Sequence, residues 1–153
     1  MALPMISQQD RDYIRDHFAQ NLRGDVTLEL YTEKKSPILI PGREECQYCE
    51  ETQQLLEEVS ELSDRISLVV HDVRANPEVM AENGVTEVPT LVYRGANRGS
   101  LRFLGIPAGN EFRNLIDGIV EVGNGESGLS DETRQALAAL KEELHLRVFV
   151  TPT

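Results

Sequence analysis

Cysteine and basic residues are both scarce in this 153-residue chain. Its two cysteines are too few for a secreted scaffold held together by disulfides. Fifteen Lys and Arg stand against 26 Asp and Glu, which gives a net charge of −11 at pH 7. We therefore expect no nucleic acid and no anionic membrane surface as a partner. The chain also lacks a membrane-spanning apolar run and a signal-peptide pattern at its N-terminus, which predicts a cytoplasmic location.

Hydrophobic residues make up 40% of the chain and charged residues 27%, a balance that suits one packed domain. Apolar periodicity, capping residues and turn residues together predict an α/β succession of elements. We expect helices over 7–22, 46–62, 76–84, 108–122 and 130–145, and strands over 26–30, 66–73, 90–94 and 101–104, with strand-like runs at 37–40 and 146–150.

Composition along the chain also predicts its division. Residues 66–73 are rich in β-branched side chains and do not alternate after Leu68, so we expect a buried strand at the centre of the sheet. Glycines at 123, 125 and 128 mark a linker. The predicted units are an N-terminal helix over 1–24, a domain over 25–123, and a linker helix with a strand over 124–153. Because nothing follows that strand, the chain is expected to be part of a longer protein.

The two cysteines lie together as Cys46-Gln-Tyr-Cys49. Zinc sites use this spacing, but a structural zinc needs four ligands, and no second cysteine pair or suitably spaced histidines are present. A redox role has a mechanism, because the N–H groups and dipole at a helix N-terminus stabilise a Cys46 thiolate. Cys49, one turn later on the apolar face, would be shielded. We expect Cys46 to attack a substrate disulfide and Cys49 to resolve the mixed disulfide.

About forty residues after Cys49, the segment Glu87-Val-Pro-Thr90 precedes an expected strand. A Val-Pro pair in this order resembles the cis-proline loop of the thioredoxin fold. The alternative is an ordinary trans proline at the first residue of a strand. The resemblance implies that Pro89, together with Val88, Thr90 and Tyr48, shapes the groove for the extended backbone of a substrate. Tyr48 could equally well pack over the disulfide.

Nearly the whole chain resembles the N-terminal half of the protein disulfide oxidoreductases of thermophilic archaea and bacteria, also called glutaredoxin-like proteins. Those proteins contain two tandem thioredoxin folds, each with its own Cys-x-x-Cys. Besides the cysteine pair and the Val-Pro loop, the matching stretches are 103–112, 131–136 and 148–153. The resemblance implies an α/β thioredoxin-like fold, with a central mixed sheet flanked by helices, an extra N-terminal helix, and a C-terminal linker helix plus strand.

The same resemblance implies how the protein works. Its substrates are protein thiols and disulfides, and its electrons come from a flavoprotein disulfide reductase. No cofactor is needed beyond the redox-active Cys46–Cys49 disulfide. Three departures from the family stand out: the stretch 32–43 is long enough for an extra strand or flap, Ile40 occupies the position where thioredoxins place a buried aspartate, and a second cysteine pair is absent.

Charged residues around the motif are expected to modulate it. Glu44 and Glu45 precede the motif, and as helix N-terminal acids they suit the helix dipole. They also oppose a thiolate at Cys46, with Arg43 as the only nearby offset. His71, on a predicted strand, is interpreted as a core or strand-end histidine rather than a catalytic base.

We therefore predict a thiol–disulfide oxidoreductase that exchanges disulfides with protein substrates. One alternative is an electron relay for a peroxide-reducing system, since a related tandem fold serves peroxide-reducing flavoproteins. Another is a non-catalytic half that docks substrates for a second unit. The apolar run at 146–150 would present an unpaired strand edge, so a weak homodimer is also predicted.

Overall fold

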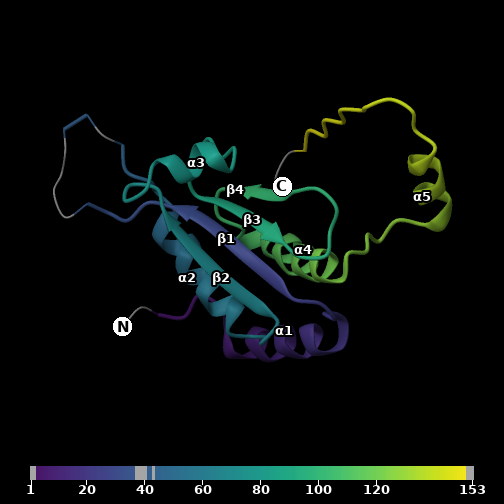
Figure 1. Cartoon of the computed structure of the whole chain (residues 1–153). Helices are drawn as coiled ribbons and strands as arrows, with labels where there is room; N and C mark the ends of the chain where they lie inside the picture. The colour runs from purple at the N-terminus through teal and green to yellow at the C-terminus, as the bar shows by residue number, and fades with distance from the viewer. Residues whose placement is uncertain (1–2, 37–40, 43, 151–153) are drawn as a thin grey trace.

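The computed structural model describes residues 3–36, 41–42 and 44–150 of the chain. In these residues, four strands and several helices alternate along the sequence (Figure 1). The strands are β1 (Val26–Thr32), β2 (Ile66–Asp72), β3 (Thr90–Arg94) and β4 (Leu101–Leu104). The α-helices are α1 (Gln8–Asn21), α2 (Cys49–Ser60), α3 (Glu78–Glu82), α4 (Phe112–Asn124) and α5 (Asp131–Ala138), and a 3-10 turn, η1 (Gly109–Glu111), precedes α4.

The sheet is mixed and has the strand order β2-β1-β3-β4. β1 pairs with β2 in parallel and with β3 antiparallel, while β3 and β4, the strands predicted over 90–94 and 101–104, pair antiparallel. The expectation that residues 66–73 form a central strand was wrong, because β2 lies at the edge and leaves Val69 and Val70 exposed by 40% and 36%. β-branched residues favour an extended strand whether or not its second face is covered.

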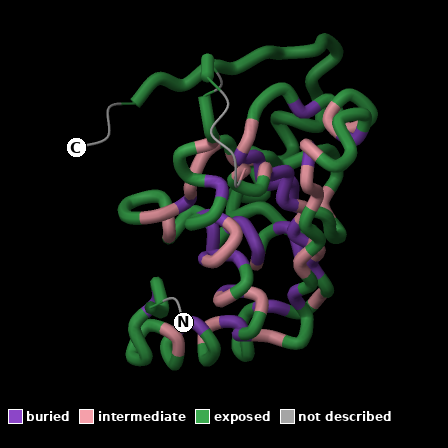
Figure 2. Tube along the Cα trace, turned by 90° about the vertical axis from the view of Figure 1, so that its left-hand side faces the viewer, coloured by how far each residue is buried: buried purple, intermediate pink, exposed green. Residues whose placement is uncertain are grey.

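The two faces of the sheet carry cores of very different size. Successive side chains of a strand point to opposite faces, so Leu30 and Tyr31 belong to different clusters. The larger cluster joins β1, β2 and β3 to helices α1, α2 and α4, which gather on one side of the sheet in Figure 1. The smaller cluster lies under α3 and contains Tyr31, Val73, Val79, Val85 and Val92. Buried segments accordingly concentrate in the middle of the body (Figure 2).

Helix α1 confirms the predicted N-terminal helix. The Ser7 hydroxyl accepts a hydrogen bond from the Asp10 N–H and caps the helix. Ile14 and Phe18, four residues apart, are buried in the larger cluster, and Leu22 follows them. The helix therefore packs on the sheet through the apolar stripe that its sequence predicts.

Two glycines let the entry to β1 approach the end of α4. A Cβ on Gly24 would lie 2.1 Å from the Gly123 carbonyl oxygen, and a Cβ on Gly123 would lie 2.5 Å from a Leu22 methyl group. Helix α4 continues to Asn124, where Gly125 ends it with a φ of +66°. Gly123 thus lies inside a helix, and the linker begins later than the sequence predicted.

The C-terminal segment differs most from expectation. Helix α5 is capped by Ser130 but ends at Ala138, whereas the predicted helix extended to 145. The run 146–150 forms no strand, and its apolar side chains are at least 80% exposed. In Figure 1 the chain after α5 runs outside the body in a wide arc. The predicted strand was wrong because a strand needs a partner ladder, and none of the described strands pairs with it.

Smaller differences concern single elements. The short helix after β2 is capped at Pro77 rather than Asn76 and ends at Glu82. The run 37–40, predicted as strand-like, lies outside the described residues. None of the helices in the described ranges combines the length and the apolar character needed to cross a membrane.

Candidate active site at the start of helix α2

Cys46 and Cys49 form a disulfide beside the first turn of α2. Their sulfur atoms are 2.05 Å apart and their Cα atoms 5.6 Å apart. The helix begins at Cys49, three residues later than predicted, so Cys46 lies just before the helix and Tyr48 occupies the N-cap position. Cys49 is 2% exposed, whereas Cys46 is partly exposed and Tyr48 is 46% exposed. The two cysteines are therefore unequally exposed to solvent.

The end of strand β1 holds Cys49 in place. The Thr32 hydroxyl donates a hydrogen bond to the Cys49 carbonyl oxygen at 3.4 Å, and Thr32 is itself 1% exposed. The backbone N–H of Glu33 donates to the Cys49 sulfur at 3.5 Å. On the helix side, the Thr52 hydroxyl donates to the Tyr48 carbonyl oxygen at 2.6 Å. The first turn of α2 is thus tied both to the strand and to itself.

Glu33 and Arg74 are site residues that sequence reasoning missed. One carboxylate oxygen of Glu33 accepts a hydrogen bond from the Cys46 N–H at 2.9 Å. The other oxygen accepts from the Arg74 guanidinium at 2.9 Å, and the two side chains are only 13% and 18% exposed. The hydrogen bond from Arg74 to Glu33 raises the pKa of the guanidinium further. Arg74 therefore stays charged around neutral pH.

The sheet register explains why these two residues meet. Strands β1 and β2 are parallel, and Thr32 pairs with Asp72 at their carboxyl ends. Glu33 follows one strand directly and Arg74 follows the other after one residue, so both reach the same edge of the sheet. The only sequence signal was a charged residue after each of two strands. It could be used only once those strands were known to be neighbours.

The Val88–Pro89 peptide bond is cis, as the resemblance implied. Thr90 begins β3 directly after it and pairs with Tyr31 of β1. The Thr90 hydroxyl donates to the Glu87 carbonyl oxygen at 2.7 Å, and Pro89 accepts a hydrogen bond from the Gly105 N–H at 2.8 Å. This loop is therefore fixed on both sides, and it lies beside the same end of β1 that holds Cys49.

The acidic residues around the motif are exposed, and nearby cations partly compensate their negative charge. Glu44 and Glu45 are both exposed, and Glu50 forms an ion pair with Lys35. Arg43, the predicted modulating cation, lies outside the described residues. The expectation that it is the only nearby offset was wrong, because Arg74 and Lys35 also place positive charge near the motif.

His71 lies on the other face of the sheet from α2. Its ring stacks on Tyr31 with a centroid distance of 4.7 Å and an interplanar angle of 24°. The two residues are direct partners in the β1–β2 register. This placement agrees with the interpretation of His71 as a strand histidine that packs.

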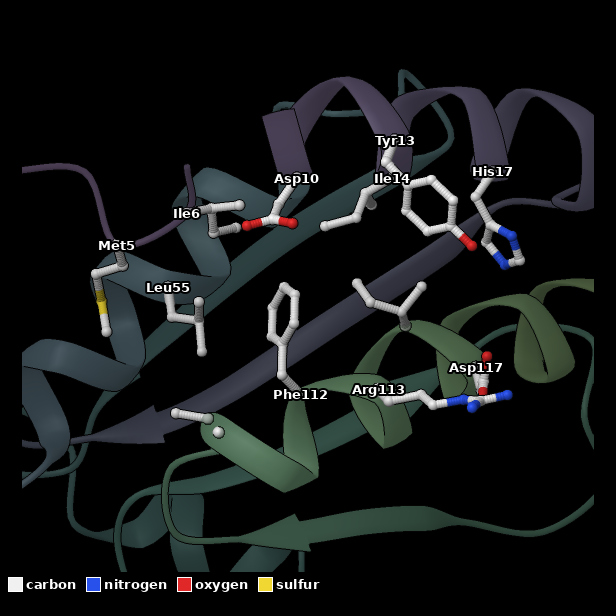
Figure 3. Close-up of a pocket in the computed structure, with 13 residues that line it drawn as sticks. Met5, Ile6, Asp10, Tyr13, Ile14, His17, Leu55, Phe112, Arg113 and Asp117 are labelled. Carbon is white, nitrogen blue, oxygen red and sulfur yellow. The ribbon is translucent and has the colours of Figure 1, made fainter. Parts of the chain in front are cut away.

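Two hollows of the surface differ in their relation to the motif. A cleft of about 480 Å³ between the end of β1 and α2 is lined by Glu33, Lys35 and Cys49, among others. A larger groove of about 670 Å³ lies between α1, α2 and α4 (Figure 3). Tyr13 and Phe112 line this groove from opposite sides, but no cysteine does. Within the described ranges, no group of three or more His, Cys, Asp or Glu side chains is placed to hold a metal ion.

The comparisons with known proteins agree with this geometry. Residues 37–117, more than half of the chain, match the family model of the thioredoxin domain. No curated protein matches the chain at a significant level.

Solved structures add a longer match. The chain is similar to a protein disulfide oxidoreductase from Aeropyrum pernix K1, with 29% identity and a TM-score of 0.71 over 88% of this chain and 55% of that one. It is also similar to a mutant of the alkylhydroperoxide reductase protein AhpF from Enterococcus faecalis, with 23% identity and a TM-score of 0.70 over 88% of this chain and 61% of that one. The second likeness shows the fold alone. The chain thus spans little more than half the length of either protein.

Proposed function

Because this chain belongs to the thioredoxin domain family, we propose that it is a thiol–disulfide oxidoreductase that acts on protein substrates. The observation that carries the proposal is the unequal burial of the two bonded cysteines. Cys46 is accessible enough to meet a substrate disulfide, whereas Cys49 is 2% exposed and faces the interior. A pair built this way attacks with one sulfur and resolves with the other.

The exchange begins from the reduced pair. The Cys46 thiol loses its proton to solvent, and the thiolate attacks one sulfur of the substrate disulfide, releasing the other as a thiolate. Cys49 then loses its proton and attacks the Cys46 sulfur, which breaks the mixed disulfide and releases the second substrate thiol. Two electrons pass from the cysteine pair to the substrate, and the Cys46–Cys49 disulfide forms again.

The loop of Val88, Pro89 and Thr90, with Tyr48, is assigned as the groove for an extended stretch of substrate. The support is its place beside the carboxyl end of β1, where Thr32 contacts Cys49. Tyr48 is half-exposed next to the disulfide, so it can cover an incoming peptide. A flavoprotein disulfide reductase is the electron donor that the family resemblance implies.

The wider organisation of the protein is part of the same proposal. Residues 25–123 would form the thioredoxin-like unit, 1–24 its added helix, and 124–153 the connection to a second unit. Likeness to an oxidoreductase of which this chain covers only 55% supports this division. In such a protein the two units would share the work of exchange.

A trapping experiment tests the function. We expect the reduced protein to accelerate reduction of insulin disulfides by dithiothreitol. Cys49→Ser should accumulate mixed disulfides with a substrate peptide through Cys46, because the resolving thiol is gone. Cys46→Ser is the matched control and should trap none. If the wild-type chain reduces no disulfide and Cys49→Ser traps no peptide, the chain is a docking half rather than an enzyme.

A brief iodoacetamide pulse tests the roles of the two cysteines. Cys46 should be alkylated first in the reduced protein because it is the more exposed of the two. Mass mapping of the labelled peptides identifies the modified sulfur. Labelling mainly at Cys49 would reverse the assignment.

A further inference from the structure

A partly buried ion pair connects the cysteine motif to the loop after β2. The carboxylate of Glu33 bonds to the Cys46 N–H with one oxygen and to Arg74 with the other, each at 2.9 Å. The backbone N–H of the same glutamate points at the Cys49 sulfur. A single residue therefore contacts both cysteines, through its side chain at one and its backbone at the other.

We propose that Glu33 and Arg74 are positioning residues that set how readily the Cys46 thiol gives up its proton, the carboxylate opposing the thiolate and the guanidinium limiting that opposition. The consequence for disulfide exchange rests on the proposed function, but the acidity of Cys46 does not. It can be measured on the reduced protein without any turnover.

Charge and burial explain the direction of the effect. A negative charge held against the backbone of Cys46 disfavours a second negative charge on its sulfur, so it raises the pKa of the thiol. At 13% exposure the carboxylate is screened by water much less than a surface acid. Arg74 supplies a compensating positive charge 2.9 Å from the carboxylate. The pKa of Cys46 therefore reflects two opposing effects of the pair: the carboxylate raises it, and the guanidinium limits that rise.

Other charges face the same region and are weaker candidates. Glu44, Glu45 and Glu51 are exposed, and Glu50 is engaged by Lys35. Asp72 and Glu45 lie close enough to Arg74 to contribute to its raised pKa. None of these acids makes a recorded hydrogen bond to the backbone of either cysteine in the described residues. Their influence on Cys46 should be smaller and more sensitive to salt.

Opposite charge changes provide the test. Glu33→Gln keeps an oxygen that can accept the Cys46 N–H but removes the charge, so the pKa of Cys46 should fall by about one unit. Arg74→Gln removes the guanidinium that pairs with the carboxylate, so the pKa of Cys46 should rise. Arg74→Lys keeps the positive charge, so the pKa of Cys46 should return most of the way to its wild-type value. The pKa is read from the pH dependence of Cys46 alkylation in the reduced protein.

Glu58→Gln is the matched control. Glu58 pairs with Arg11, and the two side chains have exposures of 12% and 18%, almost the same as those of Glu33 and Arg74. It sits nine residues after Cys49 on α2 and bonds to the N-terminal backbone instead. Its replacement should lower the melting temperature but leave the pKa of Cys46 unchanged. A general response to losing a partly buried ion pair would appear in this control as well.

Equilibration with glutathione gives an independent readout. If Glu33→Gln lowers the pKa of Cys46 by about one unit, the reduced form gains stability only where the thiolate is populated. The ratio of reduced to oxidised protein should rise little at pH 6 and up to about tenfold at pH 10. A merely structural effect would give the same change at every pH.

The outcomes separate the two proposals. Shifts of opposite sign in Glu33→Gln and Arg74→Gln support the inference even if the chain reduces no disulfide, in which case only the proposed function fails. Shifts of the same sign, or none, overturn the inference even if exchange activity is intact. Exposed Glu44→Gln and Glu45→Gln should each move the pKa less than Glu33→Gln, and a larger effect would assign the role to the surface acids.

Discussion

The two faces of the sheet are built unequally, although the same strands supply both. On one face, side chains such as Leu28 and Leu91 are covered by α1, α2 and α4. On the other, Val92 packs in a small cluster under the five-residue helix α3. Beyond that cluster the second face carries an ion pair between Glu29 and Arg94, with the arginine 45% exposed.

The difference shows how the fold separates stability from chemistry. The face under α1, α2 and α4, here called the covered face, supplies most of the apolar burial, which is the main favourable term in folding. The face under α3, here called the thin face, is less covered. At the adjoining edge, where β1 and β2 end, there is room for polar groups close to the disulfide. Consecutive residues at the end of β1 serve the two needs, because Thr32 bonds to the first turn of α2 and Glu33 bonds to Arg74.

The largest effect on stability should come from the covered face. Leu28 is fully buried in the middle of β1. Leu28→Ala should reduce the free energy of unfolding by about 3 kcal/mol, since it removes buried methyl groups and leaves a cavity that three packed helices cannot close. Urea unfolding followed by far-UV circular dichroism measures it. A loss below about 1 kcal/mol would mean that this face relaxes as easily as the other.

A matched pair of valines sharpens the comparison. Val26 of β1 and Val92 of β3 are 1% and 0% exposed and belong to the larger and the smaller cluster respectively. Val26→Ala should cost about 2 kcal/mol and Val92→Ala about 1 kcal/mol, because the flexible Met80, which packs against the smaller cluster, can move into the space. Equal losses in the same urea experiment would show that both faces are packed equally tightly.

The covered face is also the part that the sequence predicts best. Burial on one side produces a regular spacing of apolar residues in both elements. The spacing is four residues in α1, at Ile14 and Phe18, and two residues in β1, at Val26, Leu28 and Leu30. Strand positions on the thin face carry polar as well as apolar residues, such as Glu29 and Tyr31 of β1, so they show no apolar period. Val69 and Val70 are chemically like core residues, yet they lie on an edge strand, because strand order depends on long-range pairing.

The candidate site divides in the same way. The cysteine pair and the cis Val88–Pro89 loop are contiguous motifs, so the sequence and the resemblance together were enough to find them. Glu33 and Arg74 are 41 residues apart and meet only because β1 and β2 are parallel neighbours. Local patterns contain no information about such a contact.

Two tyrosines extend the comparison to alkaline pH. Burial raises the pKa of Tyr93, on the covered face, well above its ordinary value. Burial and then the Glu29 carboxylate also raise the pKa of Tyr31, on the thin face, where Arg94 opposes the rise. A tyrosine that stays protonated in the native state gives stability that is complete below pH 10 and is lost as the unfolded chain ionises above it.

Tyr93→Phe should therefore remove more of the alkaline destabilisation than Tyr31→Phe. The difference between wild type and Tyr93→Phe should grow by about 1.4 kcal/mol between pH 9 and pH 11, since the unfolded tyrosine ionises near pH 10. Urea unfolding at the two pH values measures this growth for each variant. A larger growth for Tyr31→Phe would place the more strongly shielded hydroxyl on the thin face.

The smallest effect on stability should come from the C-terminal segment, which belongs to neither face. Leu146, Val148 and Phe149 are 82%, 85% and 88% exposed, so they contribute almost no burial to the folded chain. Removal of residues 146–153 should leave the melting temperature unchanged within about 1 °C. A clear fall on truncation would mean that the segment packs on the sheet, with the thin face and its edge strand as the surface still open to it.

Association, in contrast, should respond to this segment. Its exposed apolar residues and unpaired backbone favour pairing with the same segment of a second copy about a two-fold axis. Pro152 has no N–H to donate, so the ladder would be short and the dimer weak. Sedimentation should show a concentration-dependent dimer for the full chain that is lost on truncation and equally in Val148→Asp, which keeps the length. Identical association in all three proteins would rule out strand pairing and direct attention to the groove between α1 and α4.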